Sequence, residues 1–463
     1  MLKCDLLVDS KDLRATLLRL KKDEDFTILL DMTAVDYSKF PDSTPSRFAV
    51  VYVLRSSDFK KETTVKAFVS DETLSVDTVS DIFPSANWAE REAYDQYGVI
   101  FLNHPNLKRV LNHKQFIGHP LRKDYKITQG QICTETEDLM DEMLPLLKSK
   151  GYTDEEIADL MLLNVGPSHP ASHGTIRNFV ALEGETIAAC VTEIGYLHRG
   201  FEKACEHHTY SQVIPYTDRL NYCSAILNNI GWAKAIEDMM KIEITPRAKM
   251  IRVVIGELSR IIDHFVCNAA NMVDLGGLTS LWYLFGARDQ AYDLLSKLTG
   301  ARLTNTYTRI GGLEFDLYDG FEKDLEEVLK TSEKAIEDVL SLIAHNKLFH
   351  DRTQDIGVIK ADFALANGIS GPNLRAAGVA HDLRKDKPYY GYENFDFDLV
   401  IGSHGDVYDR MMCRFEESIQ SIKIIRQAMK NMPDGAINVY APNLVLPNKK
   451  DVYGNIEGLM NQF

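Results

Sequence analysis

Residues 163–203 read LNVGPSHPASHGTIRNFVALEGETIAACVTEIGYLHRGFEK, and within them the chain changes from strand-like to helix-like patterning. The segments TIRNFVAL and TIAACVTEI flank a turn at Glu183, Gly184 and Glu185, which predicts a β-hairpin. Before the hairpin, the prolines and glycines of GPSHPASHG predict an irregular loop. The hairpin therefore marks the start of a second, different region of the chain.

Helical patterns follow this hairpin. Thr245 followed by Pro246 predicts a helix start, because proline is favoured at the first helical position. Apolar residues then recur at every third or fourth position, at Ile251, Val254, Leu258, Ile261 and Phe265. Similar patterns cover about residues 217–241, 286–299, 320–345 and 403–431. We therefore expect a helical bundle behind the hairpin.

The first 130 residues mix both patterns. LRATLLRL has helical spacing, whereas RFAVVYVLRS and TTVKAFVS read as strands. This block has 19 basic and 19 acidic residues, whereas residues 131–160 have 2 basic and 9 acidic residues. The excess of acidic residues indicates a solvated connector with short helices. Thr153 and Glu156 predict a capping box at the start of one of these helices. The predicted class is α+β: a small α+β domain over 1–130, an acidic linker over 131–160, and a mainly α-helical bundle with an N-terminal β-hairpin over 161–463.

The composition excludes several classes of protein. With 463 residues, 45% of them hydrophobic, the chain can bury a sizeable core, and a net charge of −15 is unlike that of a nucleic-acid binder. Seven scattered cysteines form no C-x-x-C pair, which argues against disulfide scaffolds and zinc ribbons and favours reduced thiols in a cytoplasmic setting. No apolar run reaches the ~18 residues of a membrane span, so other chains would have to hold the protein at a membrane.

Residues 88–125 are rich in Arg, Lys, His and aromatic residues, yet Pro, Gly and Asn interrupt them. One interpretation is a charged surface loop. The other is a docking arm against another protein, because arginine and aromatic side chains anchor interfaces.

Five histidines lie within 40 residues of one another: His169, His173, His198, His207 and His208. Three interpretations are open. The histidines could bind a metal, they could be loop residues hydrogen-bonded to the backbone, or one of them could donate a hydrogen bond or proton to a carbonyl-bearing ligand. Tyr222 near a helix start and Asp274 at a Gly-rich turn could assist such a histidine, but each is also an ordinary core or capping residue. Spacing alone does not bring them together.

Long motifs then identify a family. Within residues 90–125, EREAYDQYGVIF, HPNLKRVL and GHPLRKDY resemble the C subunit of respiratory complex I, NADH:quinone oxidoreductase. Residues 162–427 resemble its D subunit, the 49-kDa-type core subunit related to the [NiFe]-hydrogenase large subunit, through motifs that include LNVGPSHPASHGTIR, PYTDRLNYCSA, GELSRIIDH and GPNLRAAGVAHDLRKDKPYYGYENFDFD. The acidic stretch would then join a fused C–D polypeptide, as some bacteria have.

The resemblance implies a peripheral-arm core subunit of a proton-translocating NADH:quinone oxidoreductase, inactive in isolation. Its substrate would be quinone, bound at a headgroup site formed with the B subunit, which carries the terminal [4Fe–4S] cluster, while this chain itself would bind no metal or cofactor. The family's headgroup ligands fall on His173 and Tyr222, the acid partner of that histidine on Asp274, and the arginine beside the cluster on Arg199.

The same resemblance implies the partners and location of the chain. Besides the B subunit, they would be the I-type ferredoxin-like, G-type and membrane-arm H/A-type subunits, at the cytoplasmic side of the bacterial inner membrane, with no nucleic acid. Asn221 and Ser224 stand where a hydrogenase would have its first C-x-x-C pair, which disfavours the alternative of a membrane-bound hydrogenase-type subunit. D subunits continue beyond the region that matches Phe463, so a C-terminally short assembly or scaffold fragment is a further alternative. The electron donor and the kind of quinone stay open.

Overall fold

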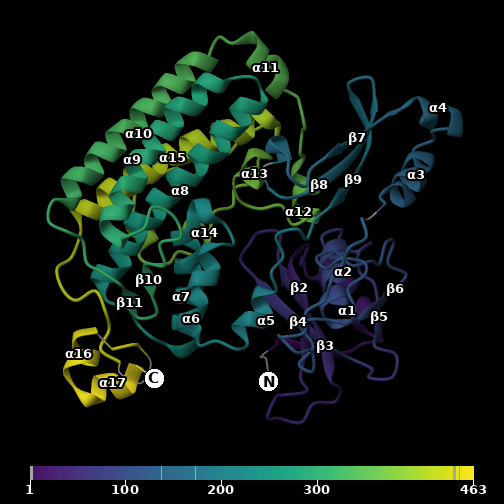
Figure 1. The fold of residues 1–463 in the computed structure, drawn as a ribbon, viewed down its shortest axis with the longest axis horizontal. Helices are drawn as coiled ribbons and strands as arrows, with labels where there is room; N and C mark the ends of the chain where they lie inside the picture. Colours follow the sequence, from purple (N-terminus) through teal and green to yellow (C-terminus); the bar gives the residue numbers. More distant parts are fainter. Residues whose placement is uncertain (1–3, 137, 173, 442–444, 448, 463) are drawn as a thin grey trace. The chain divides into compact units, whose positions relative to one another are not determined.

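The computed structural model describes residues 4–136, 138–172, 174–441, 445–447 and 449–462, which form two compact units (Figure 1). The first unit comprises the chain up to Glu206 together with Asp362–Ile369, and the second comprises His207–Ala361 and the chain from Ser370 onward. Strands dominate the first unit and helices the second. The predicted α+β class is therefore confirmed.

The first unit is built around a four-stranded sheet. Its strands are β1 (Leu6–Asp9), β4 (Glu62–Val69), β3 (Phe48–Arg55) and β2 (Ile28–Asp36), in that order, with β1 parallel to β4 and the other pairs antiparallel. The helices α1 (Leu13–Asp23) and α2 (Ala86–Tyr97) complete its core, and the short strands β5 (Ser75–Asp77) and β6 (Ile100–Leu102) pair in parallel. The helix and both strands predicted in this block are confirmed.

The charged segment that follows α2 folds back onto this helix. The fully buried carboxylate of Asp95 accepts hydrogen bonds from the backbone N–H groups of Val110, Leu111 and Asn112, at 3.2, 2.9 and 2.8 Å. Arg109 donates to the same carboxylate at 2.6 Å. The backbone N–H groups of this loop have no partners in a helix or sheet, and the buried Asp95 carboxylate accepts their hydrogen bonds instead. These bonds fix the conformation of a segment that Pro, Gly and Asn interrupt.

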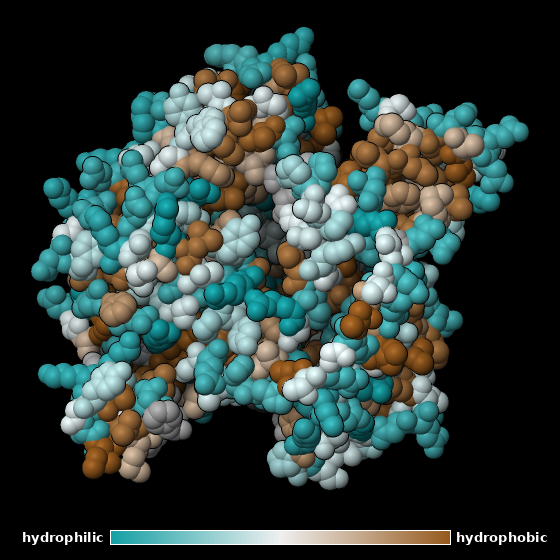
Figure 2. Space-filling model, in the orientation of Figure 1, coloured by the Kyte–Doolittle hydropathy of each residue, from teal (hydrophilic) through white to brown (hydrophobic). Residues whose placement is uncertain are grey.

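A second sheet in the first unit consists of β7 (Met161–Val165), β8 (Arg177–Glu183) and β9 (Thr186–Glu193), all antiparallel. The predicted hairpin is confirmed as β8–β9, but the sequence patterns missed β7. Apolar side chains gather over this sheet in Figure 2, and Met161, Leu163 and Ile187 are among the exposed ones.

The acidic connector is only partly solvated. Helix α4 (Asp154–Asp159) buries no residue and begins at the predicted capping box, in which Thr153 and Glu156 bond each other's backbone N–H. Helix α3 (Met140–Ser149) instead buries Met143 and Leu147 against the β8–β9 hairpin. The expectation of a solvated connector is therefore wrong for α3, because its acidic residues occupy only the outer face of an amphipathic helix.

The second unit is a helical bundle. Its long helices are α7 (Ala225–Met240), α8 (Pro246–Asp274), α9 (Leu278–Thr299), α10 (Phe321–Ile343) and α15 (Val407–Lys430). Helix α8 starts where predicted, with Thr245 as the cap and Pro246 at the first position, and its five predicted apolar positions are all buried. It packs against α7, α9 and α15, which makes it the centre of the unit.

Shorter elements complete the fold. They are η1 (Pro170–Ser172), α5 (Phe201–Cys205), α6 (Tyr210–Asp218), η2 (Tyr222–Ser224), β10 (Thr308–Arg309), β11 (Gly312–Leu313), α11 (Lys347–Thr353), α12 (Ala361–Ala366), α13 (Gly371–Ala376), α14 (Leu383–Asp386), η3 (Tyr392–Asn394), α16 (Lys449–Gly454) and α17 (Ile456–Gln462).

Candidate functional site

Tyr222 lies on the short turn η2, immediately before α7. The side chain of Asn221 holds this turn: its oxygen accepts from the Cys223 N–H at 3.2 Å, and its amide nitrogen donates to the Ser224 hydroxyl at 2.8 Å and to Asp263 at 3.2 Å. Tyr222 itself is 61% exposed. A locally fixed backbone therefore presents a phenol to its surroundings.

Asp274 is the last residue of α8 and is exposed. Asn221 bonds Asp263, which precedes Asp274 by 11 residues in the same helix, a rise of about 16 Å. The turn that bears Tyr222 thus lies beside the middle of α8, whereas Asp274 lies at its end.

The other two predicted residues are not placed against this pair. His173 lies outside the described residues, and Arg199 is an exposed residue of the first unit, between β9 and α5. The convergence of His173, Tyr222, Asp274 and Arg199 therefore stays a prediction. In the part of the chain that the structure describes, no three His, Cys, Asp or Glu side chains are grouped so that they could hold a metal ion.

Cys223 follows Tyr222 and is half-buried. Burial, together with the negative charge of Asp263, raises the pKa of its thiol to about 11. The sulfur next to the exposed phenol is therefore a protonated thiol at neutral pH, which is a poor metal ligand and a poor nucleophile.

A buried ionic network in the second unit was not predicted. Glu257 of α8 is fully buried and accepts from Arg384 at 2.9 Å, from the Tyr392 hydroxyl at 2.6 Å and from the Ser421 hydroxyl at 2.6 Å. Burial opposes its ionisation, but the charges of Arg260 and Arg384 and these hydrogen bonds together lower the pKa of Glu257 to about 2. The carboxylate is thus a permanent anion in the core of the bundle.

His264, about two turns further along α8, repeats the arrangement. Its ring Nε2 lies 2.9 Å from a carboxylate oxygen of Glu417 on α15, whose other oxygen accepts from Arg375 at 2.6 Å. Burial lowers the pKa of His264, so Arg375 is the lasting partner of the Glu417 anion. The available sequence signal was the placement of Glu257 and His264 among the apolar positions of α8, where a charged residue requires a buried partner.

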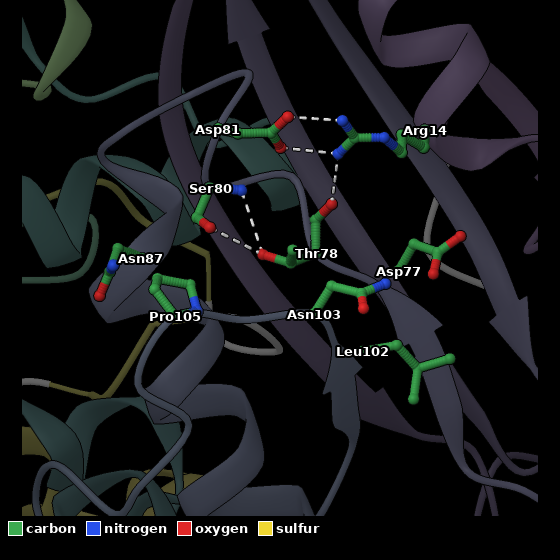
Figure 3. Close-up of a pocket in the computed structure, with 9 residues that line it drawn as sticks. All are labelled: Arg14, Asp77, Thr78, Ser80, Asp81, Asn87, Leu102, Asn103 and Pro105. Carbon is green, nitrogen blue, oxygen red and sulfur yellow. Dashed lines mark hydrogen bonds and ion pairs between the residues drawn. The ribbon is translucent and has the colours of Figure 1, made fainter.

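The first unit contains an open cavity of about 580 Å³ (Figure 3). Arg14 crosses it to form a two-point ion pair with Asp81 and to donate to the Thr78 carbonyl at 2.8 Å. The Thr78 hydroxyl donates to the fully buried carboxyl of Glu90, with 2.5 Å between the two oxygens. Burial raises the pKa of Glu90 to about 7. Of the predicted site residues that the structure describes, none lines this cavity.

Comparison with known proteins assigns the chain to a class of respiratory subunits. Residues 6–131 match the family described as the respiratory-chain NADH dehydrogenase 30 Kd subunit, and residues 274–463 match the 49 Kd subunit. The chain is 47% identical to the C/D subunit of the NADH-quinone oxidoreductase of Bdellovibrio bacteriovorus, over 98% of its own length and 80% of that protein's. It is 38% identical to the C/D subunit of the same enzyme from Psychrobacter cryohalolentis, with coverage of 98% and 78%.

The chain therefore belongs to the family of C/D subunits of NADH-quinone oxidoreductase, as the sequence motifs predicted. It is a component of a multi-subunit oxidoreductase of the respiratory chain. Among the described residues, no helix is both long enough and apolar enough to cross a lipid bilayer.

Proposed function

We propose that this chain forms, with the B subunit of the complex, the site at which a quinone headgroup is reduced. The observation that carries the proposal is the exposed phenol of Tyr222, held on a turn that Asn221 ties to α8, in a chain of this family. An anchored O–H group that faces outward can donate to a ligand without first losing a hydrogen bond inside the protein.

In this proposal, Tyr222 donates a hydrogen bond to one quinone carbonyl oxygen and His173 donates to the other. Reduction to the quinol requires two electrons and two protons, and these two donors can deliver the protons to the oxygens on which negative charge develops. Two electrons arrive from the terminal [4Fe–4S] cluster, which we assign to the B subunit.

Asp274 acts through the histidine and does not contact the quinone. Asp274 is exposed at the end of α8, and the turn that bears Tyr222 is bonded to Asp263, which lies 11 residues earlier in the same helix. A nearby carboxylate favours the imidazolium form of His173, which is the form that gives up a proton. Arg199 would place a fixed positive charge near the cluster.

We further infer the setting of this site. The chain would consist of a C-like domain (1–130), an acidic linker (131–160) and a D-like domain (161–463). It would be a peripheral protein on the cytoplasmic side of the bacterial inner membrane, with the I-, G- and H/A-type subunits as further neighbours. Its complex would couple quinone reduction to proton translocation, and the isolated chain would be inactive because no electron carrier is proposed on it.

The test is Tyr222→Phe in the assembled complex, which removes the hydroxyl and keeps the ring. We expect the NADH:quinone rate to fall by about 100-fold, while reduction of hexacyanoferrate by NADH and the yield of the complex stay unchanged. Tyr453→Phe is the matched control, since Tyr453 lies on α16 and is 87% exposed. An unchanged quinone rate in Tyr222→Phe would refute the assignment.

A further inference from the structure

A second, smaller pocket lies in the first unit, where the end of β9 meets the segment that follows α2. It is lined by residues 108–113, by residues 192–196, and by Trp88 and Arg91 of α2. Gly195 makes this junction possible: at a φ of +107°, a Cβ there would lie 2.4 Å from the carbonyl oxygen of Leu111. The two backbones therefore touch, and the walls of the pocket are fixed by main chain.

Arg91 is the buried charge of this pocket. The residue is only 6% exposed, and its guanidinium donates to the backbone carbonyls of Lys108 at 3.3 Å and Arg109 at 3.1 Å. A guanidinium has five N–H donors, so these two bonds leave three of them. Burial lowers the pKa of Arg91, and the negative charges of Glu142 and Asp95 only partly oppose this shift.

The carboxylates around the pocket are already paired with other cations. Asp95 binds Arg109 at 2.6 Å, Glu142 binds Lys108, and Glu193 binds Arg177 at 3.2 Å. Among the residues that the structure describes, no carboxylate forms an ion pair with Arg91. Glu142 and Asp95 act on Arg91 only at longer range and bind Lys108 and Arg109 directly, so a carboxylate in contact with Arg91 would offset the cost of burying this cation.

The rim of the pocket is aromatic. Trp88 and Tyr196 are each 43% exposed, and the guanidinium of Arg91 lies 5.0 Å from the centre of the Trp88 ring. Exposed Trp and Tyr side chains next to a buried Arg are typical of a hot spot in a protein–protein interface. The cavity measures about 130 Å³, below the ~300 Å³ at which pockets for small molecules begin, and thus suits a single side chain.

We propose that this pocket receives the carboxylate of an Asp or Glu side chain from another subunit of the complex. The carboxylate accepts from the remaining N–H groups of Arg91, and Trp88 and Tyr196 cover the pair and exclude water. This inference rests on the membership of a multi-subunit family and not on the quinone site, so either can fail without the other.

Site-specific cross-linking in the assembled complex tests the proposal. With Trp88→p-benzoylphenylalanine, we expect illumination to attach one segment of another subunit, and mass spectrometry of that segment to reveal an Asp or Glu within the cross-linked peptide. A cross-linked segment without an acidic residue overturns the proposal. So does an intact complex that yields no cross-link to another subunit.

Charge variants provide the second measurement. Arg91→Met keeps an unbranched side chain of four heavy atoms and removes the charged guanidinium. We expect recovery of the subunit that cross-linking identifies to fall about tenfold in a high-salt wash. Arg14→Met is the control, because Arg14 belongs to the same unit but pairs with Asp81 inside the chain. Hydrogen exchange over residues 88–113 of each isolated variant checks folding.

If Arg91→Met misfolds, Arg91→Glu combined with Lys in place of the partner's acid decides the question. Restored recovery in this double variant supports the pocket. Equal loss in the double variant and in Arg91→Glu alone overturns it.

Discussion

Replacing Glu90 by Gln should change how the stability of the first unit depends on pH. The Glu90 carboxyl is fully buried, and it accepts from the Thr78 hydroxyl at 2.5 Å and from the Val79 N–H at 2.8 Å. Burial raises its pKa from an ordinary 4.5 to about 7. Gln has a similar shape and no acidic proton, so the variant removes the titration and retains much of the packing.

The sign and size of the effect follow from linkage. Below pH 4.5 the folded and unfolded forms both hold the proton, and the contribution to stability is complete. Between pH 4.5 and 7 the unfolded chain loses its proton while the folded chain keeps it, so the free energy of unfolding falls as pH rises. A pKa raised from 4.5 to about 7 corresponds to about 3 kcal/mol lost across this window.

Urea unfolding between pH 5 and 8.5, followed by tryptophan fluorescence, measures this loss. The chain has three tryptophans, and only Trp88 lies in the first unit, so Trp232→Phe and Trp282→Phe make Trp88 the reporter. The His104 ring lies 3.9 Å from Glu90 and would titrate together with it, so both proteins also carry His104→Gln. As pH rises, the free energy of unfolding of Glu90→Gln should increase by about 3 kcal/mol relative to that of the parent protein. Parallel curves would refute the reasoning.

Two further predictions concern the second unit. Glu257→Gln should lower the free energy of unfolding by about 3 kcal/mol, because half-buried Arg260 loses its carboxylate partner and buried Arg384 keeps only Asp382. Urea unfolding followed by circular dichroism measures this loss, and a loss no larger than that of the exposed control Glu393→Gln would contradict the prediction. Cys223, with its pKa of about 11, should be alkylated at pH 8 roughly 100-fold more slowly than an ordinary thiol. Mass spectrometry against exposed Cys190 checks this rate, and equal labelling of the two cysteines would show the prediction to be wrong.

Elements set by neighbouring residues were predictable. The Thr245–Pro246 start of α8, the capping box of Thr153 and Glu156, and the β8–β9 turn depend on groups that lie within a few positions of one another. Strand β7 was missed because its residues are mostly exposed and show no alternation of buried and exposed positions, so only its pairing with β8 defines it.

Part of the candidate site was likewise predictable from sequence motifs, and part depends on contacts between distant residues. Motifs identified the family and pointed to Tyr222, which is 61% exposed and whose role in the site stays a prediction. No spacing rule related Tyr222 to Asp274. The bond between Asn221 and Asp263, which are far apart in sequence, placed the turn that bears Tyr222 beside α8. His173 lies outside the described residues, so the geometry of that part of the site stays a prediction.

The amino-acid sequence by itself determined the α+β class, the long amphipathic helices and the family, because these follow from local periodicity and from motif identity. Only the tertiary structure decided which charges are buried and with what partner: Glu257 with Arg384, and Glu417 with His264. It also buried Arg91 without a direct ion pair to any carboxylate among the described residues. The physical reason is that the free energy of a charge depends on the dielectric and the counter-charges around it, and folding brings those from distant parts of the chain.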